Sequence, residues 1–201
     1  MITSKHLLSY GVDTSQANLI SEKDFNKINK RSAVNTGDIL LSMIGTVGNI
    51  SLIVENEITF AIKNVALFKT SEVKDLIFYT LCYLKSNKIK QLIGAKLLGS
   101  TQNYISLTEL RNLPFIIPSE YKLSQFNKLI TPLFKQITCN TNILLKLIHL
   151  RDILLPKLML ENCDSSSDKL SFIIYINICI LNYNIIDNVR YLIISITLNL
   201  I

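Results

Sequence analysis

The sequence has few residues that bind metal ions or form disulfide bonds. It contains only two histidines, His6 and His149, and four widely spaced cysteines with no Cys-x-x-Cys pair. A zinc site would need an unusual ligand set, so we expect no metal and no other cofactor. A cleavable signal sequence is also lacking, which favours a cytoplasmic protein with reduced thiols. These thiols are Cys82, Cys139, Cys163 and Cys179.

Sequence patterns of common hydrolases are absent as well. No serine, cysteine or carboxylate hydrolase pattern occurs along the chain. Gly45 and Gly48 stand between two apolar runs, and no Lys-Ser/Thr follows them. They therefore indicate a tight turn and not a nucleotide-binding loop.

Composition and charge leave the kind of partner open. Hydrophobic residues make up 49% of 201 residues, which is enough for one domain with an appendage. The formal net charge is +6, and the excess positive charge lies on residues 1–163. A basic surface attracts nucleic acid, but it also fits an ordinary soluble domain.

The polar stretch Gly99–Pro118 divides a domain-like segment from a helical one. Its loop offers hydroxyl, amide and phenol groups, and amides can pair bidentately with adenine edges. A polar turn that caps its own backbone would use the same residues. Ser106 then predicts an N-cap for a helix over 107–112, which Leu113-Pro114 ends, and Phe115–Ile117 continues as a strand-like exit.

Residues 39–68 predict a small sheet. Ile39–Ile44 is an apolar run typical of a buried strand, and Ile50–Val54 returns after a tight loop to complete a hairpin. Ile58–Ile62 and Val65–Phe68 are two short strands, or one strand bulged at Lys63-Asn64.

Helices are predicted around this sheet. Ser21 precedes a short exposed helix or turn over Asp24–Lys30, and Val73–Lys90 has the spacing of an amphipathic helix, with Gln91–Leu98 as a second piece. We therefore expect an α+β fold, in which a compact mixed α/β domain precedes a coiled-coil-like helical arm.

Heptad spacing defines the arm from Lys122 onward, with Asn140 and Arg151 as polar positions on the seam. A seam of this regularity predicts a partner helix. Thr131-Pro132 predicts a fresh helix start in its middle. The apolar seam positions, which we expect at a subunit interface, are Leu123, Phe126, Ile130, Leu133, Ile137, Leu144, Leu147 and Leu154.

Three phrases in this order resemble the type I restriction-modification specificity (S) subunit: GDILLSMIGTVGNI at 37–50, GSTQNYISLTELRNLPFIIP at 99–118 and LRDILLPKL at 150–158. The likeness covers about residues 2–160. It implies a target recognition domain that reads double-stranded DNA, and a conserved helical region that holds the methyltransferase subunits and, through them, the restriction subunit. No catalytic residues are implied, and the sequence has neither the motif of an adenine methyltransferase nor a Walker lysine loop.

On this resemblance we expect phosphate contacts from basic side chains that flank the inferred loops, and base contacts from the polar loop. A solvated basic face remains the alternative for the cluster at Lys27, Lys30 and Arg31. The expected DNA-binding residues are Lys5, Lys30, Arg31, Lys63, Lys96, Ser100, Thr101, Gln102, Asn103 and Tyr104.

The resemblance divides the chain into a recognition domain over 1–118, a helical arm over 119–160, and a linker with an Ile/Asn-rich tail over 161–201. Recognition domains of the family begin with an upstream Gly/Pro-rich segment and an aromatic strand, which we expect to be missing here, leaving a sheet edge open. The tail is interpreted as a degenerate or frame-shifted end, since polar residues divide it into pieces shorter than a membrane span.

Two functions follow from this division. In the first, the chain is a working half-subunit that binds DNA and pairs its arm with another copy or with another S subunit. Alternatively, it is a truncated remnant that docks on the methyltransferase or another S subunit without reading DNA.

Overall fold

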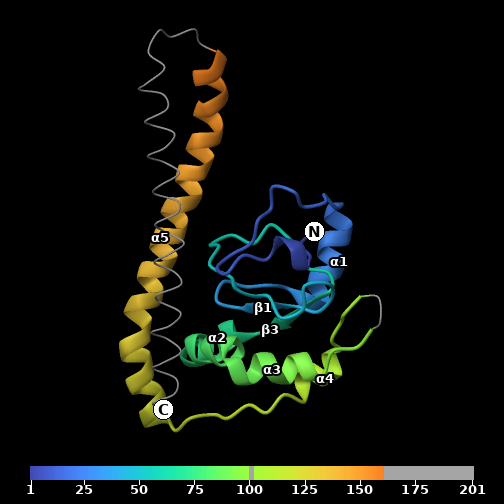
Figure 1. Ribbon diagram of the computed structural model, residues 1–201, viewed down its shortest axis with the longest axis vertical. Helices are drawn as coiled ribbons and strands as arrows, with labels where there is room; N and C mark the ends of the chain where they lie inside the picture. The colour runs from blue at the N-terminus through green and yellow to red at the C-terminus, as the bar shows by residue number, and fades with distance from the viewer. Residues whose placement is uncertain (100–101, 161–201) are drawn as a thin grey trace. The chain divides into compact units, whose positions relative to one another are not determined.

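The computed structural model describes residues 1–99 and 102–160 (Figure 1). The chain divides into two compact units, Met1–Thr131 and Pro132–Ile201. The predicted α+β class with a long helical arm is confirmed. In order, the elements are the 3-10 helix η1 (Ser4–His6), α1 (Glu22–Ser32), β1 (Ile39–Ser42), β2 (Ile50–Leu52), β3 (Val65–Phe68), the 3-10 helices η2 (Thr70–Glu72) and η3 (Lys74–Leu76), α2 (Ile77–Lys85), α3 (Asn87–Ala95), α4 (Leu107–Arg111) and α5 (Glu120–Leu160).

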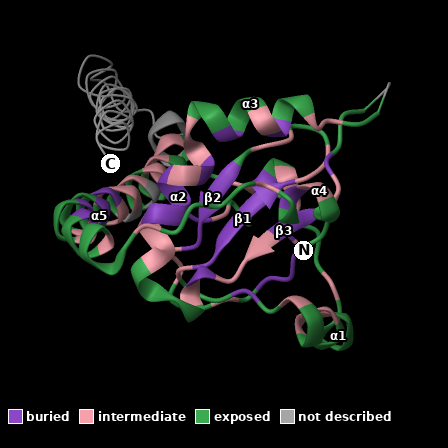
Figure 2. Cartoon of the chain, turned by 90° about the horizontal axis from the view of Figure 1, so that it is seen from below, coloured by how far each residue is buried: buried purple, intermediate pink, exposed green. Residues whose placement is uncertain are grey.

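A three-stranded antiparallel sheet forms the centre of the first unit, in the order β2-β1-β3. Leu40 of β1 lies opposite Ser51 on one side and Leu67 on the other. All four residues of β1 are buried, as the purple strand in Figure 2 shows. The predicted hairpin is therefore confirmed, and its first strand has the continuous apolar run expected of a central strand.

The N-terminal segment contributes to the core and pairs with one edge of the sheet. Ile2 packs in one cluster with Leu40, Phe60 and Ile62, and its N–H donates to the Ala61 carbonyl at 2.8 Å. Near Tyr10 the chain pairs with β2, where the Gly11 N–H donates to the Leu52 carbonyl at 2.7 Å. Part of the outer edge of β2 is thus paired.

The helix starts follow the predicted caps at two places. The Ser21 hydroxyl accepts the Asp24 N–H at 3.1 Å, and the Ser106 hydroxyl accepts the Glu109 N–H at 3.1 Å. A side chain that takes up an unpaired N–H of the first turn stabilises that end of a helix. These caps fix the start of α1 and of α4.

The predicted break near Lys90 was wrong, because the helical segment is interrupted at Ser86. Ser86 is extended, with φ −64° and ψ 150°, and caps α3 by accepting the Ile89 N–H at 3.4 Å. Its local hydrogen bond competes with continuation of α2. The helix also begins later than Val73, because the 3-10 turns η2 and η3 come before it.

Two predicted strands do not form. Ile58–Ile62 has a single bridge, between Ile62 and Ile2. Phe115–Ile117 runs without a strand assignment, and tyrosine hydroxyls from α2 bind the backbone there: Tyr79 donates to the Ile116 carbonyl at 2.6 Å and Tyr83 to the Pro114 carbonyl. Burial raises the pKa of both tyrosine hydroxyls.

The helical arm differs from its prediction at Pro132. Instead of a fresh start, Pro132 lies inside α5, where proline removes one N–H donor from the helix. The buried positions near it are Phe126, Ile130, Phe134 and Ile137, whereas the predicted seam residue Leu133 is 39% exposed. These buried residues are four, four and three positions apart in sequence. Phe134 is buried in place of Leu133, the residue predicted for the seam.

The remaining seam residues differ in exposure. Leu147 is 37% exposed, and Leu123, Leu144 and Leu154 are half-buried.

Within 1–99 and 102–160, no helix is long and apolar enough to cross a membrane. The expectations for the tail concern residues outside those described.

One buried carboxylate joins two segments at the same end of the sheet. Asp38, with no exposed surface, accepts the Asn35 N–H at 2.8 Å and the Ser71 N–H at 3.1 Å. The Lys69 ammonium lies 2.9 Å from the same carboxylate. Asp38 therefore ties the turn before β1 to the turn after β3.

Replacing this carboxylate is expected to destabilise the fold strongly. Asp38→Ala leaves two N–H groups and the Lys69 ammonium without their acceptor, so the free energy of unfolding should fall by about 3–5 kcal/mol. Urea denaturation measures this decrease. The exposed Asp24 of α1 gives a control, because Asp24→Ala should cost less than about 1 kcal/mol. Equal decreases for both variants would show that Asp38 has no such role.

Candidate nucleic-acid interface

The polar loop is held against the end of β1. Leu98 and Tyr104 exchange backbone hydrogen bonds of 2.9 and 2.8 Å. The Gly45 N–H donates to the Asn103 carbonyl at 3.1 Å, and the Ile105 N–H to the Met43 carbonyl at 2.9 Å. Gly99 has φ +103°, a conformation that favours glycine.

The amide side chains of this loop are exposed. Gln102 and Asn103 face solvent, and Tyr104 is 42% exposed. Ser100 and Thr101 lie outside the described residues. The anchoring bonds involve backbone groups, so both amide side chains remain available for an external partner.

Lys96 is engaged within the domain. Its ammonium pairs with the Glu109 carboxylate in the first turn of α4. The spacing from Ser106 predicts a capping box, in which the Glu109 side chain would accept the backbone N–H of Ser106. In the structure this carboxylate pairs with Lys96 instead. Lys96 joins the end of the loop-forming segment to α4, and it lies outside the groove described next.

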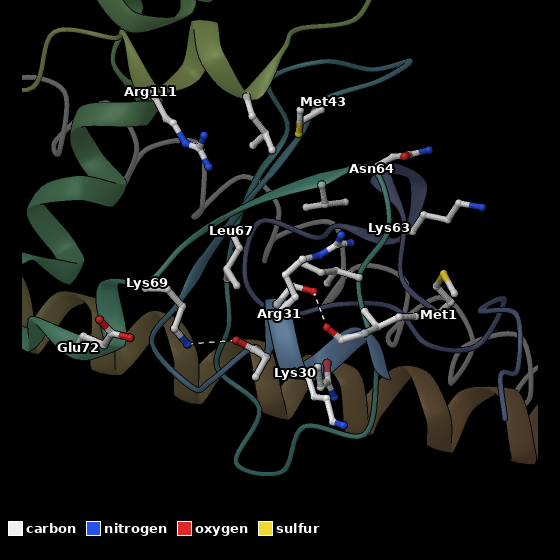
Figure 3. Close-up of a pocket in the computed structure, with 17 residues that line it drawn as sticks. Met1, Lys30, Arg31, Met43, Lys63, Asn64, Leu67, Lys69, Glu72 and Arg111 are labelled. Carbon is white, nitrogen blue, oxygen red and sulfur yellow. Dashed lines mark hydrogen bonds between the residues drawn. The ribbon is translucent and has the colours of Figure 1, made fainter. Parts of the chain in front are cut away.

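A groove with a volume of about 1090 Å³ lies between α1, the start of β3 and α4 (Figure 3). Lys30 and Arg31 reach it from the last turn of α1, and Arg111 enters from α4 on the opposite side. Among the described residues, Glu72 is the only carboxylate in its lining. We call this the basic groove; its cationic side chains are Lys30, Arg31, Lys63, Lys69 and Arg111.

Most of these cations have no partner in the part of the chain that is described. Lys69 is the exception, since its ammonium also lies 3.1 Å from the Ala33 carbonyl in addition to the Asp38 carboxylate. Lys30, Arg31, Lys63 and Arg111 make no ion pair with described residues. Four positive charges around one concave surface form a strong anion-attracting region.

One edge of the groove is formed by a turn that contains a residue in the left-handed backbone conformation. Asn64 has φ +59°, which asparagine tolerates better than most residues. Its carbonyl accepts the Met43 N–H at 3.4 Å. Because Met43 also lines the groove and bonds to Ile105, the groove and the polar loop are neighbours on one surface.

The basic groove brings together three of the five predicted phosphate contacts, Lys30, Arg31 and Lys63. Lys5 lies exposed in η1 and does not line the groove, and Lys96 is ion-paired. Sequence reasoning missed Arg111 and Lys69. Arg111 could have been found as the basic residue in the last turn of a helix that follows the polar loop directly.

Reactive and metal-binding groups are scarce in this unit. Burial raises the pKa of the Cys82 thiol to about 12, so this cysteine is inert. His6 is buried, with Nδ1 accepting the Thr3 N–H at 3.0 Å and Nε2 lying 3.2 Å from the Gln16 carbonyl. Within the described residues, no three His, Cys, Asp or Glu side chains could hold a metal ion.

The chain thus combines a small α+β domain, which has a basic groove beside an exposed amide loop, with a long helix. Residues 7–148 match the family of the type I restriction modification DNA specificity domain, and the chain belongs to this family. The resemblance stated from the three sequence phrases is thereby confirmed.

A relative of known name supports this membership. The type I restriction enzyme MjaIX specificity subunit of Methanocaldococcus jannaschii is 29% identical over 99 residues. That match covers 49% of this chain and 22% of the relative. The matched part of the chain thus spans about a fifth of the length of that specificity subunit.

Proposed function

We propose that the protein is a non-catalytic specificity component of a type I restriction-modification system. It binds double-stranded DNA, reads part of a target sequence, and directs partner methyltransferase and restriction subunits to that target. The observation that carries this proposal is the basic groove, in which cations from α1, from the residues flanking β3 and from α4 surround one concave surface beside an exposed amide loop. Family membership supports the same function.

Charge distribution in the groove favours DNA over a solvated face. Solvated protein surfaces mix both signs of charge, but the described lining of this groove has five cationic side chains and one carboxylate. DNA presents about one negative charge per 1.7 Å of helix axis, so several of these cations can contact phosphates at once. Phosphate contacts would fix the register of the duplex, and the neighbouring loop would then reach base edges.

The loop amides are expected to supply part of the sequence discrimination. Replacing both, as Gln102→Ala and Asn103→Ala, should weaken binding to the target by roughly 1–3 kcal/mol for each amide that pairs bidentately with a base. Binding to a scrambled duplex should change little, because the phosphate contacts remain. Competition between target and scrambled duplexes measures the difference, and unchanged discrimination would exclude these amides from base recognition.

Basic side chains of the groove are expected to determine the salt dependence. Each phosphate contact contributes about −0.9 to the slope of log K against log salt. The double variant Lys30→Glu/Arg31→Glu should therefore have a shallower slope than the wild type. Lys88→Glu/Lys90→Glu on α3 makes the same change in net charge outside the groove, and should keep the slope. A wild-type slope in the Lys30/Arg31 variant would remove that pair from the interface.

The helical arm is proposed to pair with a second copy, with another S subunit or with the methyltransferase subunit. A single recognition domain reads half of a bipartite site, and a two-fold pair would supply the other half. Leu144→Asp places a carboxylate in the predicted seam, so assembly should weaken by several kcal/mol. The first unit should still fold, since it has its own core.

Sedimentation of both proteins, alone and with the methyltransferase subunit, tests the arm. Ile143 is the adjacent, 51% exposed residue outside the seam, and Ile143→Asp provides the matched control with the same added charge. The partner role would be contradicted if the wild type is monomeric and the Leu144→Asp variant binds the methyltransferase subunit as tightly as the wild type does.

A further inference from the structure

A second pocket, with a volume of about 320 Å³, lies between α2, the end of β3 and α4. Its size is within the range of small-ligand sites. Aromatic rings from three segments line it, namely Phe68, Tyr83 and Phe115, together with the apolar side chains of Val73 and Leu110. None of the described residues in its lining is a carboxylate. We call it the aromatic pocket.

Ring contacts hold the wall of this pocket in place. Tyr83 meets Phe115 edge to face, with centroids 5.1 Å apart and planes at 83°. Tyr79 stacks on Tyr83 at 6.1 Å and meets the ring of Phe126 at 6.1 Å. The hydroxyl bonds of Tyr79 and Tyr83 to the 114–116 backbone fix the same wall. The pocket is therefore formed before any ligand arrives, which lowers the entropic cost of binding.

Two cationic residues belong to both cavities. Lys69 and Arg111 line the basic groove and also the aromatic pocket. The Lys69 ammonium is held by Asp38 and Ala33, whereas the Arg111 side chain makes no hydrogen bond or ion pair with described residues. The Arg111 guanidinium thus stands where a polar, anion-attracting surface meets an apolar, ring-lined one.

This junction matches the chemistry of a nucleotide, which has a flat aromatic base attached to an anionic phosphate. Aromatic walls bind bases by stacking, largely without regard to sequence. Arginine binds phosphate through its planar fork of donors. The side chain of Thr80, also in the lining, adds a hydroxyl that can meet a polar base edge.

We propose that the aromatic pocket receives a base turned out of the DNA that lies in the basic groove, with the phosphate of that nucleotide at Arg111. The inference rests on the proposed function, because the groove supplies the DNA. Turning a base out of a paired stack is unfavourable, and least so where the base has no pairing partner. The pocket should therefore distinguish a base without a partner from a fully paired one.

Two duplexes of the same sequence test this with the full chain. One is fully paired, and the other has a single 2-aminopurine opposite an abasic site. Stacking in the pocket should make the second duplex bind about tenfold more tightly. Val73→Phe puts a larger side chain at the pocket, and Val73 is 52% exposed, so the substitution should not disturb the core. This variant should bind both duplexes equally, with unchanged affinity for the paired one.

Matched variants separate the pocket from general effects of a flexible duplex. Leu19 is 99% exposed and lines neither cavity, so Leu19→Phe should keep the tenfold preference. Arg111→Gln should weaken binding of both duplexes. Fluorescence anisotropy with an end-labelled duplex measures all affinities under one salt condition.

Several outcomes would overturn the inference. The pocket does not hold a base if the wild type binds the paired duplex and shows no preference for the 2-aminopurine duplex. The same conclusion follows if Val73→Phe retains the preference of the wild type. In both cases the proposed function stands. If neither duplex binds, the proposed function fails as well. Binding of dAMP alone, abolished by Val73→Phe without any duplex preference, would assign the pocket to free nucleotide. Loss of methyltransferase binding in Val73→Phe, again without duplex preference, would assign it to a protein partner.

Discussion

The ion pair between the buried Asp38 carboxylate and the partly exposed Lys69 ammonium is the interaction on which the arrangement of the first unit depends. Asp38 accepts backbone N–H groups from two segments, at Asn35 before β1 and at Ser71 after β3. Lys69 compensates its charge at 2.9 Å and lines both the basic groove and the aromatic pocket. A buried carboxylate is tolerated only when it is paired and hydrogen-bonded, so this position fixes where β1 and β3 meet.

Charge in the groove is organised by elements that are far apart in sequence. The last turn of α1 holds Lys30 and Arg31, where cations also favour the helix dipole. The left-handed turn at Asn64 positions Lys63, and the Ser106 cap starts the short helix that positions Arg111. Each cation thus has a local structural reason for its place, and together they form one anion-attracting surface.

Local signals in the sequence were sufficient for the features that depend on local chemistry. The caps at Ser21 and Ser106, the hairpin around Gly45 and the stop at Leu113-Pro114 all follow from side-chain or turn chemistry within a few residues. The family could be inferred because three such phrases occur in one order. By contrast, the break at Ser86 was missed because the surrounding helical spacing continues across it.

Features that depend on tertiary contacts could not be predicted in the same way. The role of Lys69 requires Asp38, which lies 31 residues away in sequence. Lys96 was expected at DNA because it flanks the loop, but its partner Glu109 becomes visible only when α4 packs beside it. The extended segment after Leu113 resembles a strand in sequence, yet its carbonyls bind tyrosine hydroxyls of α2.

Lysine footprinting tests the central claim, that the basic groove meets DNA, most directly. Acetylation of the full chain, with and without a saturating duplex, would be compared lysine by lysine by mass spectrometry. The account predicts that Lys30 and Lys63 become protected, while the exposed Lys88 and Lys90 of α3 stay as reactive as in the free protein. Protection of the α3 lysines with unchanged reactivity at Lys30 and Lys63 would contradict it.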